Sequence, residues 1–90
     1  MVRVEFTSLL KRFFPNLTSL NIEANSVAEL IFELDVKYPG LSAYLIQEQG
    51  GLRKHVNIFV NGQMIKDRVN LSDTLLHNDK VNIIQALSRG

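Results

Sequence analysis

The sequence predicts an α+β domain in which one main helix packs across one face of a mixed sheet of four to five strands. Short segments with alternating apolar and polar residues occur toward both ends of the chain, which is typical of half-buried strands. A segment between them, residues 26–38, carries apolar residues at helical spacing. The length of 90 residues fits one domain with a single hydrophobic core.

The N-terminal part is expected to form two strands joined by a long connection. Apolar and polar residues alternate over residues 2–7, which predicts the first strand. Residues 8–14 are expected to form a short helical turn that ends at Pro15, because proline is poorly tolerated inside a helix. A second alternating segment, residues 20–23, predicts a strand that pairs with the first as a hairpin.

The main helix is expected to begin after Ser26. Ser26 and Glu29 have the spacing of a capping box, in which the serine oxygen accepts a backbone N–H and the glutamate reaches back to the serine N–H. Apolar residues follow at helical positions i, i+3, i+4 and i+7: Val27, Leu30, Ile31 and Leu34. Pro39 and Gly40 are expected to end the helix.

The next part of the chain predicts a helical turn followed by a hairpin. Residues 41–46 are expected to be helical, and residues 49–51 form a loop. Residues 55–60 then predict a third strand, with one face made of Val56, Ile58 and Val60. Asn61-Gly62 predicts a tight type I′ turn, because both central residues of that turn need positive φ, and residues 63–65 return as a short strand.

The last third of the chain predicts one more strand. Residues 71–76 are expected to form a single helical turn or a compact loop, and residues 77–80 a polar turn. Residues 81–86 predict the last strand. We expect it to lie parallel to the first strand, because a helical crossover allows the terminal strands to run side by side. The pattern leaves the complete strand order open.

The composition argues against several classes of site. The chain has no cysteine, which excludes disulfides, thiolate metal sites, iron–sulfur clusters and a cysteine nucleophile. Its 10 basic and 9 acidic residues are spread along the sequence, so nothing favours nucleic-acid binding. The two histidines, His55 and His77, have no further ligands at recognisable spacing, so no metal and no cofactor are expected. No nucleophile, base and orienting group occur together, which argues against an independent enzyme.

The N-terminus lacks the pattern of a signal peptide, since Met1 to Glu5 alternate rather than leading into an apolar run. No apolar segment approaches the length that a bilayer requires. A cytoplasmic protein without a membrane association is therefore expected.

The candidate functional residues lie near the C-terminus. The sequence ends in Leu87-Ser88-Arg89-Gly90, and residues 85–90 are expected to form a flexible tail. A tail whose last residue has no side chain can thread its carboxylate into a narrow site on another protein. This pattern favours a carrier whose chemistry takes place at its C-terminal carboxylate.

Two apolar residues are expected on the sheet face that points away from the helix. Phe59 and Ile84 alternate with residues expected to face the core, so each should point outward. A pair of outward apolar side chains near the tail would form a docking patch for a partner protein. A slip of one residue in either strand would reverse the faces.

Short motifs follow one another in an order that is similar to a known family. They are Val60-Asn61-Gly62, Leu71-Ser72-Asp73-Thr74-Leu75, Asn78-Asp79-Lys80-Val81 and the tail that ends in Gly90. Because its motifs follow one another in this order, the chain resembles the MoaD/ThiS group of ubiquitin-like β-grasp sulfur-carrier proteins. The resemblance covers essentially the whole chain and implies a single β-grasp domain over residues 1–90.

The resemblance implies a mechanism in which this chain is a cosubstrate. The carboxylate of Gly90 would be adenylated by an ATP-dependent E1-like activating enzyme of the MoeB/ThiF type and then converted to a thiocarboxylate. The sulfur would be donated in molybdopterin, thiamine or related biosynthesis. In a molybdopterin pathway the chain would also be the small subunit of a synthase whose large subunit is of the MoaE type. Partner contacts would fall on Phe59, Ile84, Leu87, Ser88 and Arg89.

One residue departs from the family pattern. The family ends in two glycines, whereas this chain has Arg89 before Gly90, which adds bulk and charge where the tail should enter a narrow channel. Gln85 stands where the family often has proline. Two alternatives therefore remain open: a β-grasp binding module that is not activated and keeps only its docking face, and a ubiquitin-like modifier that is conjugated through the same glycine.

Overall fold

The computed structural model describes residues 1–85 of the chain. The strands and helices expected from the sequence are present, apart from a helical turn in residues 71–76. In chain order they are β1 (Val2–Phe6), α1 (Ser8–Phe13), β2 (Leu20–Ile22), α2 (Val27–Lys37), α3 (Leu41–Leu45), β3 (Val56–Val60), β4 (Gln63–Met64) and β5 (Lys80–Gln85).

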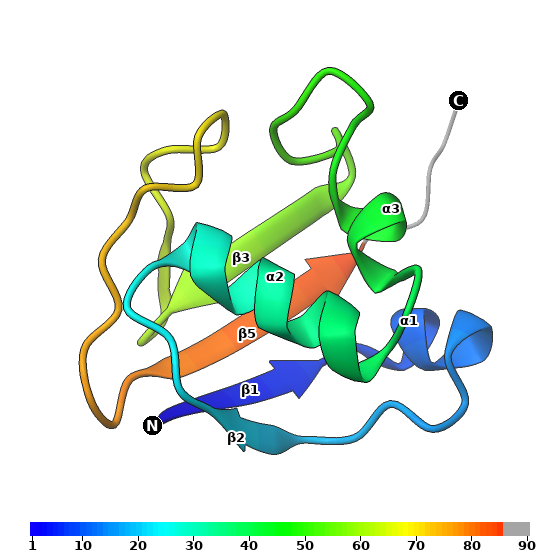
Figure 1. Cartoon of the computed structure of the whole chain (residues 1–90), viewed down its shortest axis with the longest axis horizontal. Helices are drawn as coiled ribbons and strands as arrows, with labels where there is room; N and C mark the ends of the chain where they lie inside the picture. The colour runs from blue at the N-terminus through cyan, green and yellow to red at the C-terminus, as the bar shows by residue number, and fades with distance from the viewer. Residues whose placement is uncertain (86–90) are drawn as a thin grey trace.

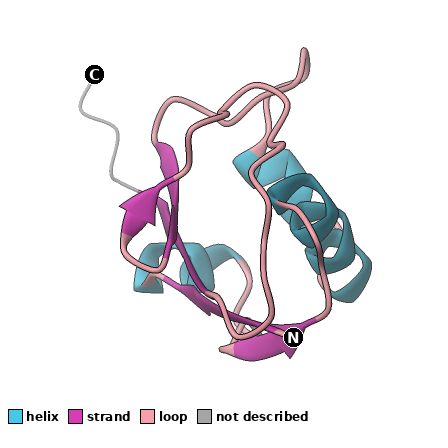
Figure 2. Cartoon of the chain, turned by 90° about the vertical axis from the view of Figure 1, so that its left-hand side faces the viewer, coloured by secondary structure: helices cyan, strands magenta, loops and turns pink. Residues whose placement is uncertain are grey.

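The strands form one mixed five-stranded sheet in the order β2-β1-β5-β3-β4. The prediction that the last strand lies parallel beside the first is confirmed, since β1 and β5 pair in parallel with Val4 opposite Val81. The other neighbours in the sheet pair antiparallel. Helix α2 crosses in front of the sheet (Figure 1), and the side view places it on one face only (Figure 2).

The core lies between α2 and the inner face of the sheet. The apolar stripe predicted for α2 is buried, and Leu30 and Leu34 are fully inaccessible. It packs with inward residues of the central strands, Val4, Val56, Ile58, Val81 and Ile83. Each such aliphatic side chain stabilises the fold by about 1.5–3 kcal/mol relative to an exposed one. No polar or charged residue among residues 1–85 is buried, so this core depends on apolar packing alone.

The capping box of α2 is present, but one of its two contacts differs from the prediction. Ser26 Oγ accepts a hydrogen bond from the Glu29 N–H at 3.2 Å, as expected. Glu29 Oε1, however, accepts from the N–H of Asn25 at 3.2 Å rather than from that of Ser26. The backbone at Ser26 instead forms an antiparallel bridge with Thr74, which brings the later segment against the start of the helix.

Residues 71–76 form a loop, so only one of the two expected alternatives is correct. The carbonyl oxygens of Leu71 and Asp73 accept hydrogen bonds from the first N–H groups of α2, at Ala28 and Val27. A helical turn would use those carbonyl oxygens within its own segment. The loop therefore satisfies donors that the start of any helix leaves without a partner.

The two turns that carry part of the family resemblance contact each other. Asn61 and Gly62 both have positive φ, as the predicted tight turn requires. Asn61 Nδ2 donates to Asp79 Oδ1 at 2.8 Å, and Asn61 Oδ1 accepts from the Lys80 N–H at 2.9 Å. These side-chain contacts join the end of β3 to the start of β5, so the motif residues hold the sheet together.

Asp67 organises the loop between β4 and β5. Its carboxylate accepts hydrogen bonds from the Ser72 hydroxyl and from the backbone N–H groups of Val69, Asn70 and Ser72. The Ser72 hydroxyl, and after it the N–H of Asn70, lower the pKa of Asp67 from 3.8 to about 2. The charged form of Asp67 is therefore favoured by the folded loop.

This pKa shift predicts a loss of stability in acid. The Asp67 pKa is lower in the folded chain, so its contribution is complete above the unfolded value of 3.8 and declines as the pH falls toward about 2. In thermal melts across that range, Asp67→Asn should have a flatter pH dependence than the wild type. The control is Glu23→Gln, at an exposed residue directly after β2, the strand at the opposite edge of the sheet. Equal pH dependence in wild type and Asp67→Asn would contradict this assignment.

Candidate functional site

The outer face of the sheet carries the two apolar residues that the sequence placed there. Ile58 and Ile83 are fully buried against α2, and the following residues, Phe59 and Ile84, point to the opposite face. The predicted faces are therefore confirmed. Phe59 and Ile84 are half-buried rather than freely exposed. Their role in partner binding stays a prediction.

Strand pairing places the two side chains close together. Phe59 pairs with Asn82, and Ile84 lies two residues further along the same strand, on the same face. Such diagonal neighbours on antiparallel strands are about 7–8 Å apart, within reach of large side chains. Phe59 also pairs with Met64 of β4, whose side chain is 49% exposed. We call Phe59, Met64 and Ile84 the outer patch.

Charged side chains lie on the same face, on the strands beside this patch. Glu5 of β1 forms ion pairs with Arg3 at 3.9 Å and with Lys80 of β5 at 3.6 Å. These side chains are substantially exposed, and such pairs stabilise a fold by only about 0–1 kcal/mol. An apolar centre with a charged margin is the composition typical of a protein-binding surface.

Arg68 supports the first residues of β3. Its guanidinium donates to Asn57 Oδ1 at 2.8 Å and to the Val56 carbonyl oxygen at 2.9 Å. Asn57 pairs with Ile84 across β3 and β5, so this contact fixes the strand beside the outer patch. Arg68 is therefore a structural residue.

Strand β5 includes one residue that we expected to belong to the tail. Gln85, which we expected to begin the tail, still pairs with Val56 of β3. Its N–H donates to Thr7 Oγ1 at 3.4 Å, and a proline at this position would lose that contact. Leu87, Ser88, Arg89 and Gly90 lie outside the described residues.

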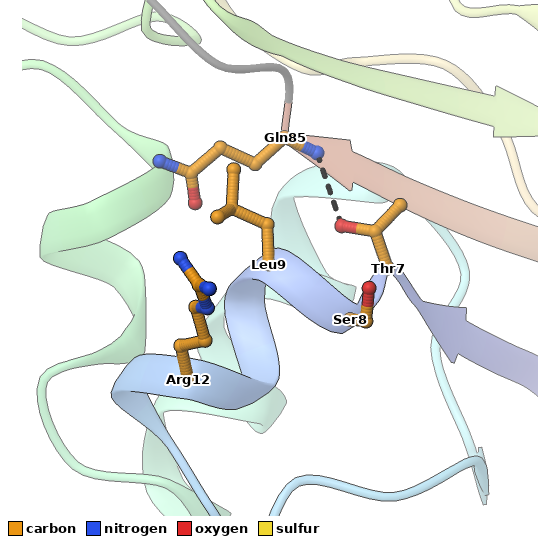
Figure 3. Close-up of a pocket in the computed structure, with 5 residues that line it drawn as sticks. All are labelled: Thr7, Ser8, Leu9, Arg12 and Gln85. Carbon is orange, nitrogen blue, oxygen red and sulfur yellow. Dashed lines mark hydrogen bonds between the residues drawn. The ribbon is translucent and has the colours of Figure 1, made fainter.

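Gln85 lies between two surface hollows. The larger has a volume of about 580 Å³ and is lined by Gln85 together with Thr7, Ser8, Leu9 and Arg12. Figure 3 shows the Arg12 guanidinium pointing toward the side-chain amide of Gln85 across this hollow. The second, of about 360 Å³, is lined by Gln85, Ala43, Tyr44 and Arg53. We call this region the tail root.

Aromatic packing fixes the two helices that line the tail root. The rings of Phe13 and Tyr44 have centroids 5.0 Å apart, and the ring of Phe14 meets Tyr44 edge-on at 5.1 Å. Each such pair contributes about 0.5–1.5 kcal/mol beyond its buried area. These contacts join α1 to α3, so the hollows have defined walls.

Residues 1–85 contain no group of three or more histidine, cysteine, aspartate or glutamate side chains placed to hold a metal ion. Within the same residues, no helix is both long and apolar enough to cross a membrane.

The sequence model of the ThiS family matches residues 10–90, which is most of the chain. The protein belongs to the ThiS family. It is 25% identical over 91 residues to the sulfur carrier protein CysO of Mycobacterium tuberculosis, with 99% of this chain and 98% of CysO covered. The family assignment confirms the MoaD/ThiS group that the motifs indicated. Members of this group are small protein carriers and not catalysts, so this ThiS-family chain is a carrier.

Solved structures confirm the β-grasp fold. The crystal structure of Mycobacterium tuberculosis CysO matches with a TM-score of 0.83 and 25% identity, covering 97% of this chain and all of CysO. A chain in the BexX/CysO complex of Amycolatopsis orientalis matches with a TM-score of 0.84 and 22% identity, with both chains fully covered. The complex of subunits 1 and 2 of the molybdopterin-converting factor from Helicobacter pylori matches with a TM-score of 0.62 and 21% identity over 99% of this chain and 97% of the other. Two of these ThiS-like folds were therefore solved together with a partner protein.

Proposed function

We propose that this ThiS-family protein carries sulfur on the carboxylate of Gly90. In the first step a carboxylate oxygen attacks the α-phosphate of ATP, pyrophosphate leaves, and an acyl-adenylate forms. In the second step the sulfur of hydrosulfide attacks the acyl carbon, the bond to AMP breaks, and AMP and a proton leave, which gives the thiocarboxylate. An E1-like activating enzyme of the MoeB/ThiF type supplies the catalytic groups. Because the activation consumes ATP, we place it in the cytoplasm.

The family match carries this proposal, because it extends to the last residue of the sequence. The similarity to CysO, a sulfur carrier, covers nearly the whole of both chains and supports the same chemistry. It also favours sulfur donation in cysteine biosynthesis as the pathway. Molybdopterin biosynthesis, with a MoaE-type large subunit as partner, is the alternative acceptor pathway, and the Helicobacter pylori structure shares the fold alone.

The proposed partner surface combines the outer patch with the tail. Phe59 and Ile84 supply an apolar contact next to the charged margin of the sheet. Leu87, Ser88 and Arg89 precede the reacting residue in the sequence and would enter the partner's channel with it. This division separates docking from chemistry, because the outer patch lies on the sheet and the reacting carboxylate lies at the end of the chain.

A second candidate function rests on Arg89. The family pattern has two glycines at the end of the chain, and a non-activated binding module would no longer need the first of them. Such a module would still bind partners through the outer patch.

Reconstitution distinguishes these two functions. The purified chain is mixed with a MoeB/ThiF-type activating enzyme, ATP and a sulfide source, and exchange of labelled pyrophosphate into ATP is measured. We expect exchange that depends on the chain, followed by replacement of oxygen by sulfur in a C-terminal peptide. Binding of the enzyme without exchange would instead support the non-activated module.

A further inference from the structure

Two arginines from distant parts of the sequence lie at the tail root. Arg12 belongs to α1 and lines the larger hollow beside Gln85, whereas Arg53 precedes β3 and lines the smaller one. Among residues 1–85, no other charged side chain lines either hollow. The last described residue of β5 therefore has positive charge on both sides.

Both guanidinium groups retain N–H donors for another molecule. Arg53 Nε donates to the Ala43 carbonyl oxygen at 2.9 Å, which fixes the side chain and leaves its terminal N–H groups available. The Arg12 side chain makes no hydrogen bond or ion pair with the described residues, and both arginines are exposed. The ion pairs formed within residues 1–85 both use Glu5, so no carboxylate of that part neutralises these two charges.

The side chain of Gln85 indicates that the larger hollow lacks a hydrogen-bond donor. Its Oε1 atom is buried and has no hydrogen-bond partner among residues 1–85. A buried acceptor without a partner costs about 1–3 kcal/mol. Figure 3 shows that the Arg12 side chain points toward this amide without forming a hydrogen bond. A partner segment that enters the hollow can offer an N–H or O–H donor to Gln85 Oε1 and a carboxylate to the Arg12 guanidinium.

We propose that Arg12 and Arg53 form a basic collar that binds an acidic rim on the activating enzyme, around the opening that admits the tail. The inference rests on the proposed function. Guanidinium groups pair with carboxylates through two parallel hydrogen bonds, which makes acidic side chains the matching chemistry. The formal net charge of the chain is only +1, so overall basicity does not explain this positive cluster.

The collar also gives Arg89 a role. In the sequence Arg89 adds one further positive charge, next to Gly90. A channel whose opening is acidic accepts an arginine that a neutral, narrow channel would exclude. The departure from the glycine pair then becomes a feature that selects one activating enzyme over others by charge.

Charge at the margin of an interface acts mainly on the association rate and on its salt dependence. The collar should therefore lower the KM of the activating enzyme for this chain and leave kcat unchanged. Neutralising both arginines should raise KM by about 10-fold at low salt. The difference should shrink between about 0.01 M and 0.15 M salt, because the Debye length shortens from about 30 Å to about 8 Å.

The experiment measures KM and kcat for pyrophosphate exchange with a MoeB/ThiF-type enzyme that activates the wild-type chain. The variants are Arg12→Gln, Arg53→Gln and the double substitution. Arg53→Lys keeps the charge but loses the two parallel hydrogen bonds, so its KM should lie between the KM values of the wild type and of Arg53→Gln. Lys66→Gln, an exposed cation in the loop after β4, is the matched control and should change KM little. Thermal melts check that each variant is folded.

A double variant that is folded and keeps the wild-type KM at every salt concentration would overturn the collar and leave the proposed function intact. A KM increase that does not depend on salt, or that also appears in Lys66→Gln, would overturn it as well. If no MoeB/ThiF-type enzyme activates the wild-type chain, the proposed function fails and the collar fails with it.

Discussion

Deletion of Gly90 is expected to abolish activation of this ThiS-family chain. The deletion leaves the carboxylate on Arg89, whose side chain and restricted backbone do not fit a site shaped for a terminal residue without Cβ. Pyrophosphate exchange should fall to the level seen without the chain. Binding to the activating enzyme should be largely retained, because the outer patch and the proposed collar are unchanged.

Arg89→Gly is the matched control for this deletion. It keeps Gly90 and restores the pair of glycines that the family pattern has, so activation should persist. Its KM should rise if the acidic rim contacts Arg89. A deletion variant that is activated as well as the wild type would show that Gly90 is not the reacting residue.

The second prediction with a large effect compares substitutions on the two faces of β3. Ile58 is fully buried and pairs with Ile83 in the centre of the core, so Ile58→Ala should lower the free energy of unfolding by about 2–5 kcal/mol. Phe59→Ala, at the next residue, removes a half-buried side chain from the outer face and should cost less stability. It should weaken binding to the activating enzyme instead, by about 2 kcal/mol if Phe59 anchors the interface.

Chemical denaturation and affinity measurements on the same two variants check this division. Ile58→Ala, assayed where it remains folded, should bind with nearly the wild-type affinity. The outer-patch assignment is wrong if Phe59→Ala loses as much stability as Ile58→Ala and binds the enzyme like the wild type.

Alternation in the sequence was sufficient to predict the faces of β3 and β5. Ile58 and Phe59 face opposite sides as expected, because one strand face is completely apolar and any slip in register would expose it. Met64 was missed, although the Asn61-Gly62 turn fixes the hairpin register that places it opposite Phe59. A two-residue turn at Asn61-Gly62 places Val60 opposite Gln63 and Phe59 opposite Met64, so the turn alone predicts this neighbour.

Other features depend on contacts between distant segments. The loop at residues 71–76 is not helical because its carbonyl oxygens accept hydrogen bonds from the start of α2. Arg12 and Arg53 line hollows that share Gln85 only because α1 and the segment before β3 both lie beside the end of β5. No local pattern in the sequence signals either arrangement.

The motifs that carried the family resemblance have mainly structural roles in the described residues. Asn61 and Asp79 join two turns, and Asp73 accepts hydrogen bonds from the N–H groups of Lys66 and Asp67. They identify the fold because they stabilise it. The proposed chemistry depends on other residues, at the end of the chain, which is why a fold match alone does not establish activation.

The most direct test is the intact mass of the protein isolated from its own cells, measured with and without an alkylating probe for thiocarboxylates. We expect a fraction of the protein to carry sulfur in place of oxygen, and the probe to modify only the C-terminal peptide that contains Gly90. An unmodified carboxylate, which persists when an activating enzyme, ATP and a sulfur source are supplied, would contradict the sulfur-carrier function proposed for this chain.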